Sequence, residues 1–295
     1  MSFAPPLTLS TGSLELKLSP SIGGSISSLE WTGSGGRAAV LRKCNSCPEN
    51  VLEAASFPLV PYVNRIRGGR FDFRGREVAL AVNMAGDPSP LHGQGWLAPW
   101  EVDSAAASQA VLSFHHRPGE WPWEYCAEQC FELDEAGLSL RLTCRNLSDE
   151  PMPCGLGQHP YFQCGPATRI DTRVTHVWTI DEQVLPVGKI AAAGRFDLAD
   201  RPVCGQDLDH GFGGWGGTAR MTDPGWPFDL ELSSPDARFF QLYSPASGGI
   251  FVAEPVSHAN AALNAPEEQW DELGMRVLDP GEDMSLDMRL EVNPK

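Results

Sequence analysis

A carboxylate, Glu254, and two histidines, His92 and His159, lie among aromatic and turn-forming residues in a chain of 295 residues. An imidazole can give or take a proton near neutral pH, and a partly desolvated carboxylate becomes a useful base. These residue types therefore offer general acid–base chemistry. These three residues lie in PLHGQGWLAPWEV (90–102), GLGQHPYF (155–162) and FVAEPVSHANAALN (251–264). A fourth segment, PYVNRIRGGRF (61–71), has a similar composition.

Glu254 and His159 are the strongest candidates for proton transfer. Glu254 follows four apolar residues and precedes Pro255, so we expect it at the end of a buried strand, where desolvation raises its pKa. His159 precedes Pro160, which biases it toward an extended conformation and holds the imidazole at a defined angle. The alternatives are a surface glutamate at a strand end and a structural histidine.

His92 is expected on a loop, beside an indole. The glycines that follow it allow other groups to approach closely, although a histidine bonded to the backbone would have the same surroundings. Trp96 and Trp100 could provide flat apolar faces of the kind on which sugar rings stack.

Two charged positions are less distinctive. The guanidinium of Arg65 suits hydroxyl and carboxylate oxygens, but it could equally make a structural ion pair. In DLDHGFGGW (207–215), the acidic pair is compatible with a plain turn, and spacing alone does not decide between Asp207 and Asp209.

Alternating apolar and polar residues dominate the elements that must position these groups. Leu14, Leu16 and Leu18 are expected on one face of a strand, and GRFDFRGREVAL is typical of a hairpin that turns at Gly75. The strand-like segments, bounded by Gly, Pro, Asn and Asp, fit an antiparallel β-sandwich. They include AVLSFHH, YCAEQCFELDEAGLSLRLTCRN, TRIDTRVTHVWTI, FDLELSS and FFQLYSP.

Helices are predicted to be few and short. ENVLEAASF favours one turn or two, and APEEQWDELG is expected to begin at Pro266 and end at Gly274. No internal repeat or linker is visible, and strand-like segments run from about residue 7 to residue 292. We therefore predict a single all-β domain over residues 1–295.

The composition limits the partners. The net charge is −16 and no dense Lys/Arg run occurs, which disfavours nucleic acid and anionic membranes and permits neutral ligands such as sugars. No secretory signal or run of about 18 apolar residues is visible. We expect a cytoplasmic protein, a monomer or homodimer, without a membrane partner.

The eight cysteines are expected to be inert thiols in a reducing compartment. Cys44 and Cys47 form a CxxC motif, but no second such motif completes a zinc site. Cys126 and Cys130 should share one face of a strand. We predict no metal site and no cofactor.

Taken together and in order, the motifs resemble the aldose 1-epimerase (mutarotase) family. The resemblance covers nearly the whole chain and rests on NRI (64–66), HGQGW (92–96), HPYF (159–162), LDHGF (208–212) and EPVSHANAALN (254–264). Each motif alone is weak, and five in the correct order are specific. The family implies a large antiparallel β-supersandwich, galactose mutarotase-like, with an open sugar cleft on its concave face.

The resemblance also implies residue roles and a reaction. Glu254 matches the general base, His159 the general acid and His92 a second active-site histidine, while Arg65 and Asp209 match positions that contact sugar hydroxyls. Asn64 and Trp96 belong to the same motifs and are expected to bind substrate. The reaction would be exchange of the α and β anomers of an aldose by ring opening, with base and acid on opposite sides of the C1–O5 bond.

The chain departs from the family pattern at Asn260, where many members carry an acidic residue, and at Gln158. The preferred sugar is therefore left open. Three other functions fit part of the pattern. They are a non-catalytic carbohydrate-binding domain, a glycoside hydrolase, which needs two carboxylates, and a mutarotase for modified or phosphorylated sugars, which needs more cationic residues than Arg65 and Arg67.

Overall fold

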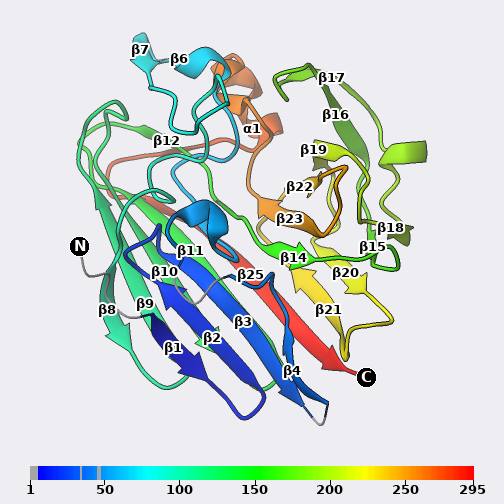
Figure 1. Cartoon of the computed structure of the whole chain (residues 1–295). Coiled ribbons are helices and arrows are strands. Elements are labelled where there is room, and N and C mark those ends of the chain that lie inside the picture. The colour runs from blue at the N-terminus through cyan, green and yellow to red at the C-terminus, as the bar shows by residue number, and fades with distance from the viewer. Residues whose placement is uncertain (1–5, 34, 45–47) are drawn as a thin grey trace.

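A nine-stranded antiparallel sheet forms one layer of the computed structural model, which describes residues 6–33, 35–44 and 48–295. The last strand of the chain, β25, lies between β21 and β11, so the C-terminal strand is at the centre of this layer (Figure 1). The strands in spatial order are β18 (Arg201–Pro202), β15 (Arg169–Thr172), β20 (Thr218–Thr222), β21 (Phe228–Ser233), β25 (Asp283–Pro294), β11 (Gly137–Asn146), β10 (Tyr125–Leu133), β9 (Gln109–His116) and β8 (Glu101–Ala105).

The N-terminal strands form a smaller sheet that packs on this layer. Trp31 meets Phe228 of β21 edge to face, with 5.8 Å between ring centroids. Gln129 of β10 donates from its Nε2 to the carbonyl oxygen of Gly24 at 2.9 Å. The four strands are β1 (Leu7–Ser10), β2 (Leu14–Ser19), β3 (Ser25–Gly33) and β4 (Gly36–Ala39).

An eight-stranded sheet carries most of the polar motifs. The described residues also form two separate two-stranded sheets, one made by β6 and β7 and one by β12 and β24. The eight strands are β17 (Pro186–Ala191), β16 (His176–Ile180), β19 (Leu208–Gly213), β22 (Phe239–Ser244), β23 (Ile250–Val256), β13 (Gly157–Gln158) and β5 (Pro58–Leu59), with β14 (Tyr161–Gln163) paired to β23. The strands of the two-stranded sheets are β6 (Arg70–Phe73), β7 (Arg76–Ala79), β12 (Met152–Cys154) and β24 (Arg276–Leu278).

The antiparallel β-sandwich predicted from alternation, and the supersandwich that the family resemblance implied, are confirmed. Leu14, Leu16 and Leu18 are all buried, and β6 and β7 form the expected hairpin around Gly75. Inward-facing side chains of the three sheets join in one apolar core, which the two-residue period of a strand makes possible.

Helical structure is short, as predicted. The C-terminal helix begins after Pro266 as a 3₁₀ turn, continues as α1 (Trp270–Leu273) and ends at Gly274, whose φ of 80° suits a helix C-terminus. The 3₁₀ turns are Val51–Glu53, Arg67–Gly69, Gly194–Phe196, Ala262–Asn264 and Glu267–Gln269. Within the described part of the chain, no helix has the length and apolarity needed to cross a membrane.

Candidate functional site

The strand register places the polar residues of the eight-stranded sheet on one face. Glu254 of β23 lies opposite Gln241 of β22, and Tyr243, two residues further along β22, lies opposite Asp209 of β19. Side chains two residues apart on a strand, and directly opposed across strands, point to the same side. Glu254, Gln241, Tyr243 and Asp209 therefore project together.

Loops and short strands between residues 52 and 161 cover this face and leave a cavity of about 270 Å³. Tyr161 of β14 pairs with Val252 of β23, which brings His159 beside Glu254. The residues that line the cavity are Leu52, Phe57, Asn64, Arg65, Met84, Leu91, His92, Trp96, His159, Tyr161, Asp209, Gln241, Tyr243 and Glu254. Few cationic groups and several hydroxyl, amide and carboxylate groups make this lining suitable for a small polar ligand.

His159 and Glu254 form the central pair. Nε2 of His159 lies 3.5 Å from Oε1 of Glu254, and their side chains are only 11% and 4% exposed. The imidazole stacks on Phe57, with 4.4 Å between ring centroids, and its Nδ1 is buried with no hydrogen-bond partner among the described residues. Packing on aromatic rings, rather than a carboxylate at Nδ1, therefore orients this histidine.

Burial pushes both members of the pair toward their uncharged forms. It lowers the pKa of His159 from its usual 6.5 to about 3, because an imidazolium is poorly solvated there. Burial also raises the pKa of Glu254 well above its usual value, an effect that nearby Asp209 adds to and Arg65 opposes. Over a wide pH range the two groups thus share one proton.

His92 is locked as a hydrogen-bond donor. Its Nδ1 accepts from the backbone N–H of Asn64 at 3.1 Å, and its own backbone N–H donates to the carbonyl oxygen of Asn64 at 3.0 Å. The neutral ring must then carry its proton on Nε2. Burial lowers its pKa well below the usual value, so the ring stays neutral. Gly93, at φ 73°, packs against Val60, where a side chain would clash.

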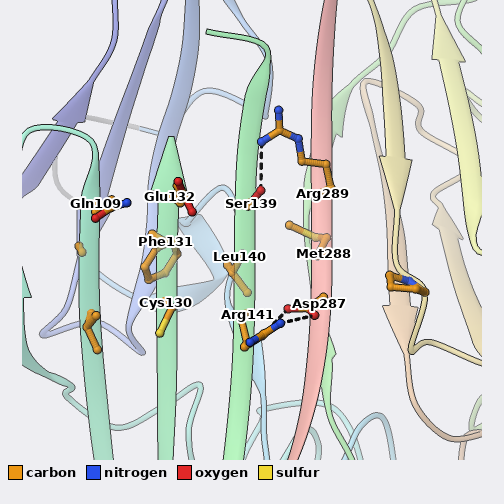
Figure 2. Close-up of a pocket in the computed structure, with 13 residues that line it drawn as sticks. Gln109, Cys130, Phe131, Glu132, Ser139, Leu140, Arg141, Asp287, Met288 and Arg289 are labelled. Carbon is orange, nitrogen blue, oxygen red and sulfur yellow. Dashed lines mark hydrogen bonds and ion pairs between the residues drawn. The ribbon is translucent and has the colours of Figure 1, made fainter. Parts of the chain in front are cut away.

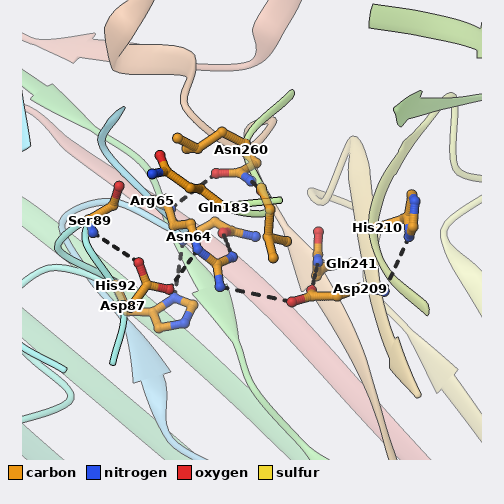
Figure 3. Close-up of polar contacts among 12 residues, drawn as sticks. Asn64, Arg65, Asp87, Ser89, His92, Gln183, Asp209, His210, Gln241 and Asn260 are labelled. Atoms are coloured by element: carbon orange, nitrogen blue, oxygen red, sulfur yellow. Dashed lines mark hydrogen bonds and ion pairs between the residues drawn. The ribbon is translucent and has the colours of Figure 1, made fainter. Parts of the chain in front are cut away.

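Arg65 lies between two carboxylates (Figure 3). Its Nε donates to Oδ2 of Asp87 at 2.8 Å, and its Nη1 donates to Oδ1 of Asn64 at 3.1 Å. Its Nη2 lies 3.9 Å from Oδ2 of Asp209, while Gln241 donates from its Nε2 to the other oxygen, Oδ1, at 2.7 Å. The guanidinium is thus held in place with one end facing the cavity.

The family model of the aldose 1-epimerases matches residues 6–291. The chain belongs to the aldose 1-epimerase family.

Relatives agree with this assignment. The uncharacterized protein YphB of Escherichia coli K12 is 34% identical over 251 residues, which are 81% of this chain and 84% of YphB. The crystal structure of a candidate aldose 1-epimerase from Escherichia coli K12 has a TM-score of 0.89 at 31% identity and covers 98% of this chain and 99% of its own. A galactose 1-epimerase from Lactobacillus acidophilus shares the fold, with a TM-score of 0.76 at 17% identity and coverage of 98% and 94%.

The residues that the sequence singled out in this aldose 1-epimerase family member converge in space. The cavity lining includes all seven predicted site residues: Glu254, His159, His92, Arg65, Asp209, Asn64 and Trp96. Asp209 lines the cavity and Asp207 does not. Asn260, at the position where an acidic residue was expected, accepts the backbone N–H of Arg65 at 3.1 Å and so supports this arginine from behind.

Two expectations are wrong. Trp100 offers no face to a ligand in the cavity, because it is buried against Phe114 and its Nε1 donates to the carbonyl oxygen of Gly95. Glu254 and His159 do not lie on opposite sides of a bond, since a separation of 3.5 Å leaves no room for a bond between them. They are adjacent groups in the cavity lining.

Several lining residues were not predicted, namely Leu52, Phe57, Met84, Leu91, Tyr161, Gln241 and Tyr243. Gln241 left a usable signal, since it is a polar residue within the apolar strand FFQLYS and is only 4% exposed. The aromatic and aliphatic residues left none, because the same types fill the core throughout this family member.

A second cavity, of about 580 Å³, lies on the nine-stranded sheet (Figure 2). Two of its charged residues are paired with each other: Arg141 donates to both carboxylate oxygens of Asp287, at 2.7 and 2.8 Å. It lacks an adjacent acid and base.

Cys126 and Cys130 share the outward face of β10, as expected, whereas Cys47 of the CxxC motif lies outside the described residues. No group of three or more His, Cys, Asp or Glu in residues 6–33, 35–44 and 48–295 is arranged to hold a metal ion.

Proposed function

We propose that the protein catalyses exchange of the α and β anomers of a free aldose, with Glu254 as general base and His159 as general acid. Membership of the aldose 1-epimerase family supports an isomerase acting on a sugar. The observation that carries the residue roles is the buried pair in the cavity, with 3.5 Å between Nε2 of His159 and Oε1 of Glu254.

The chemistry needs one base and one acid. Glu254 takes the proton of the C1 hydroxyl, the O–H electron pair becomes the second bond of the aldehyde, and the C1–O5 bond breaks. Its electron pair goes to O5, which takes a proton from His159. After rotation about C1–C2, the same steps run in reverse and close the ring on the other face of the aldehyde.

Adjacent groups suit this reaction because O1 and O5 are both bonded to C1. An acid and a base that are neighbours can therefore reach the two oxygens at the same time. The pair needs only one proton, which passes from Glu254 to His159 before a closed ring opens and is on Glu254 again once the ring is open. The net charge of the pair is the same in both states, so the cavity gains no net charge during turnover.

The charges around the cavity favour a neutral aldose over a phosphorylated one. Arg65 is the cationic residue of the lining, and Asp87 and Asp209 flank it. Arg67 is not part of the cavity lining. Its guanidinium instead contacts Asp181 and the carbonyl oxygen of Pro186. A phosphate dianion would find no unmatched cation at this site.

The pH dependence should reveal the one-proton pair. The pair of Glu254 and His159 gains a second proton only when the pH falls to near the lowered pKa of His159, about 3. It loses its one proton only when the pH rises above the raised pKa of Glu254. We therefore expect kcat/KM for anomer exchange to be level around pH 4.5 and to fall on the acid side only as the pH approaches about 3. An acid limb near 4.5, the usual value of glutamate, would contradict the shared proton.

The test of the function is anomer exchange itself. A panel of aldoses, including glucose and galactose, is examined by NMR saturation transfer between the α and β anomeric protons, and spontaneous exchange is measured in the same buffer without protein. We expect faster exchange for at least one aldose. Sugar binding without any acceleration would instead favour a carbohydrate-binding protein.

A further inference from the structure

Asp87 lies behind the cavity, outside its lining, and its side chain makes two hydrogen bonds. Its Oδ2 accepts from Nε of Arg65 at 2.8 Å, and its Oδ1 accepts the backbone N–H of Ser89 at 2.9 Å (Figure 3). Its side chain is only 7% exposed. We propose that Asp87 is a positioning residue, which holds Arg65 apart from Asp209 so that one substrate hydroxyl fits between them. This inference rests on the anomer exchange proposed above.

The hydrogen bonds of Arg65 leave one end of its guanidinium available. Nε donates to Asp87 and Nη1 donates to Asn64. Nη2 has no acceptor within hydrogen-bond distance in the part of the chain that the structure describes, because Oδ2 of Asp209 is 3.9 Å away. Nη2 of Arg65 can therefore still donate a hydrogen bond and Oδ2 of Asp209 can still accept one, and the two atoms face each other across a gap of 3.9 Å.

The width of this gap suits a hydroxyl group. A hydroxyl oxygen that accepts from Nη2 at about 2.9 Å and donates to Oδ2 at about 2.7 Å has normal lengths for both bonds. With 3.9 Å between the outer atoms, the angle at that oxygen is about 90°. A hydroxyl can therefore accept from Arg65 and donate to Asp209 at once.

Without Asp87 the gap would close. An unrestrained guanidinium and a buried carboxylate attract one another and prefer direct, often bidentate, contacts of about 2.7–2.9 Å. Asp87 resists this movement because its own loop is anchored: the side chain of Asn83 bonds both the N–H and the carbonyl oxygen of Leu91, at 2.8 and 2.7 Å. The loop carries Asp87 as a fixed anion on the far side of Arg65.

The proposal is tested with Asp87→Asn and deoxy sugars. The aldose that exchanges fastest is compared with its 2-, 3-, 4- and 6-deoxy analogues in wild type and D87N. Hydrogen bonds to charged groups are strong, so we expect wild type to lose about 10- to 100-fold in kcat/KM for one analogue. In D87N that loss should shrink to about threefold, with KM raised for the parent sugar and kcat nearly unchanged.

A structural role alone would slow all the sugars equally and leave their ratios intact, which would overturn the proposal. The matched control is Asp287→Asn, which breaks the Arg141 pair on the distant sheet and should leave every ratio unchanged. Should D87N fail to fold, Asp87→Glu keeps the charge and pushes the guanidinium toward Asp209. Wild-type discrimination in D87E would then overturn the proposal. A wild-type protein that exchanges no aldose would overturn the proposed function itself, and this inference with it.

Discussion

Replacing Glu254 by Gln is expected to lower the rate of protein-catalysed anomer exchange by about 10²- to 10⁴-fold, the range for loss of one general acid–base group. The glutamine side chain has nearly the same shape but cannot take the proton of the C1 hydroxyl. His159→Asn should have an effect of the same order, because the acid that protonates O5 is lost. The fold should persist in both variants.

The two substitutions should not be additive. Glu254 and His159 act on one shared proton at a separation of 3.5 Å, so removing the second group from a protein that lacks the first should cost little more. Exchange is measured by saturation transfer or by polarimetry on freshly dissolved α-glucose and α-galactose. Glu128→Gln, at an exposed position of β10, is the matched control. Near-wild-type exchange in E254Q or H159N would refute the assigned roles.

Replacing His258 by Ala should cost about 3–5 kcal/mol of unfolding free energy. His258 is 2% exposed, and its Nε2 accepts the backbone N–H of Val63 at 2.9 Å. Because Nε2 accepts, the single N–H proton of the neutral ring is on Nδ1, which donates to the carbonyl oxygen of Ala259 at 2.8 Å. Alanine leaves two buried backbone groups without partners and a cavity where the ring was.

Conservative variants separate these contributions. A glutamine side chain would retain an acceptor near the position of Nε2, and an asparagine side chain would retain a donor near that of Nδ1. His258→Gln and His258→Asn should therefore each lose less stability than His258→Ala. Urea denaturation gives the free energies of unfolding. Equal losses in all three variants would show that the hydrogen bonds contribute little and that packing dominates.

The same histidine makes stability depend on pH. Burial lowers the pKa of His258 from 6.5 to about 4, so the unfolded chain binds more protons than the folded one between those values. Its contribution to the free energy of unfolding therefore falls as the pH falls from 6.5 toward 4, by up to about 1.4 kcal/mol per pH unit. In H258Q the slope of the unfolding free energy against pH over this window should be smaller by the amount that corresponds to about one proton. An unchanged slope would mean that His258 is not buried in its neutral form.

Short-range patterns in the sequence determined the class of fold and most of the candidate site. Alternation along strands is a local consequence of backbone geometry, so Leu14, Leu16 and Leu18 could be assigned to one face without a structure. Glu254 was recognisable as a polar residue between apolar residues and Pro255, and His159 as a histidine between a glycine-rich segment and Pro160. The motifs that resemble the family added the residue roles.

Partnerships across the chain were decided by tertiary structure alone. The sequence could not tell that Trp100 packs into the core whereas Trp96 lines the cavity, because the two indoles lie four residues apart in one loop-like segment. Nor could it show that Asp87 holds Arg65, or that Gln241 lies opposite Glu254. Strand register and loop closure set these contacts, and both depend on the packing of segments far apart in the chain, which local residue patterns do not encode.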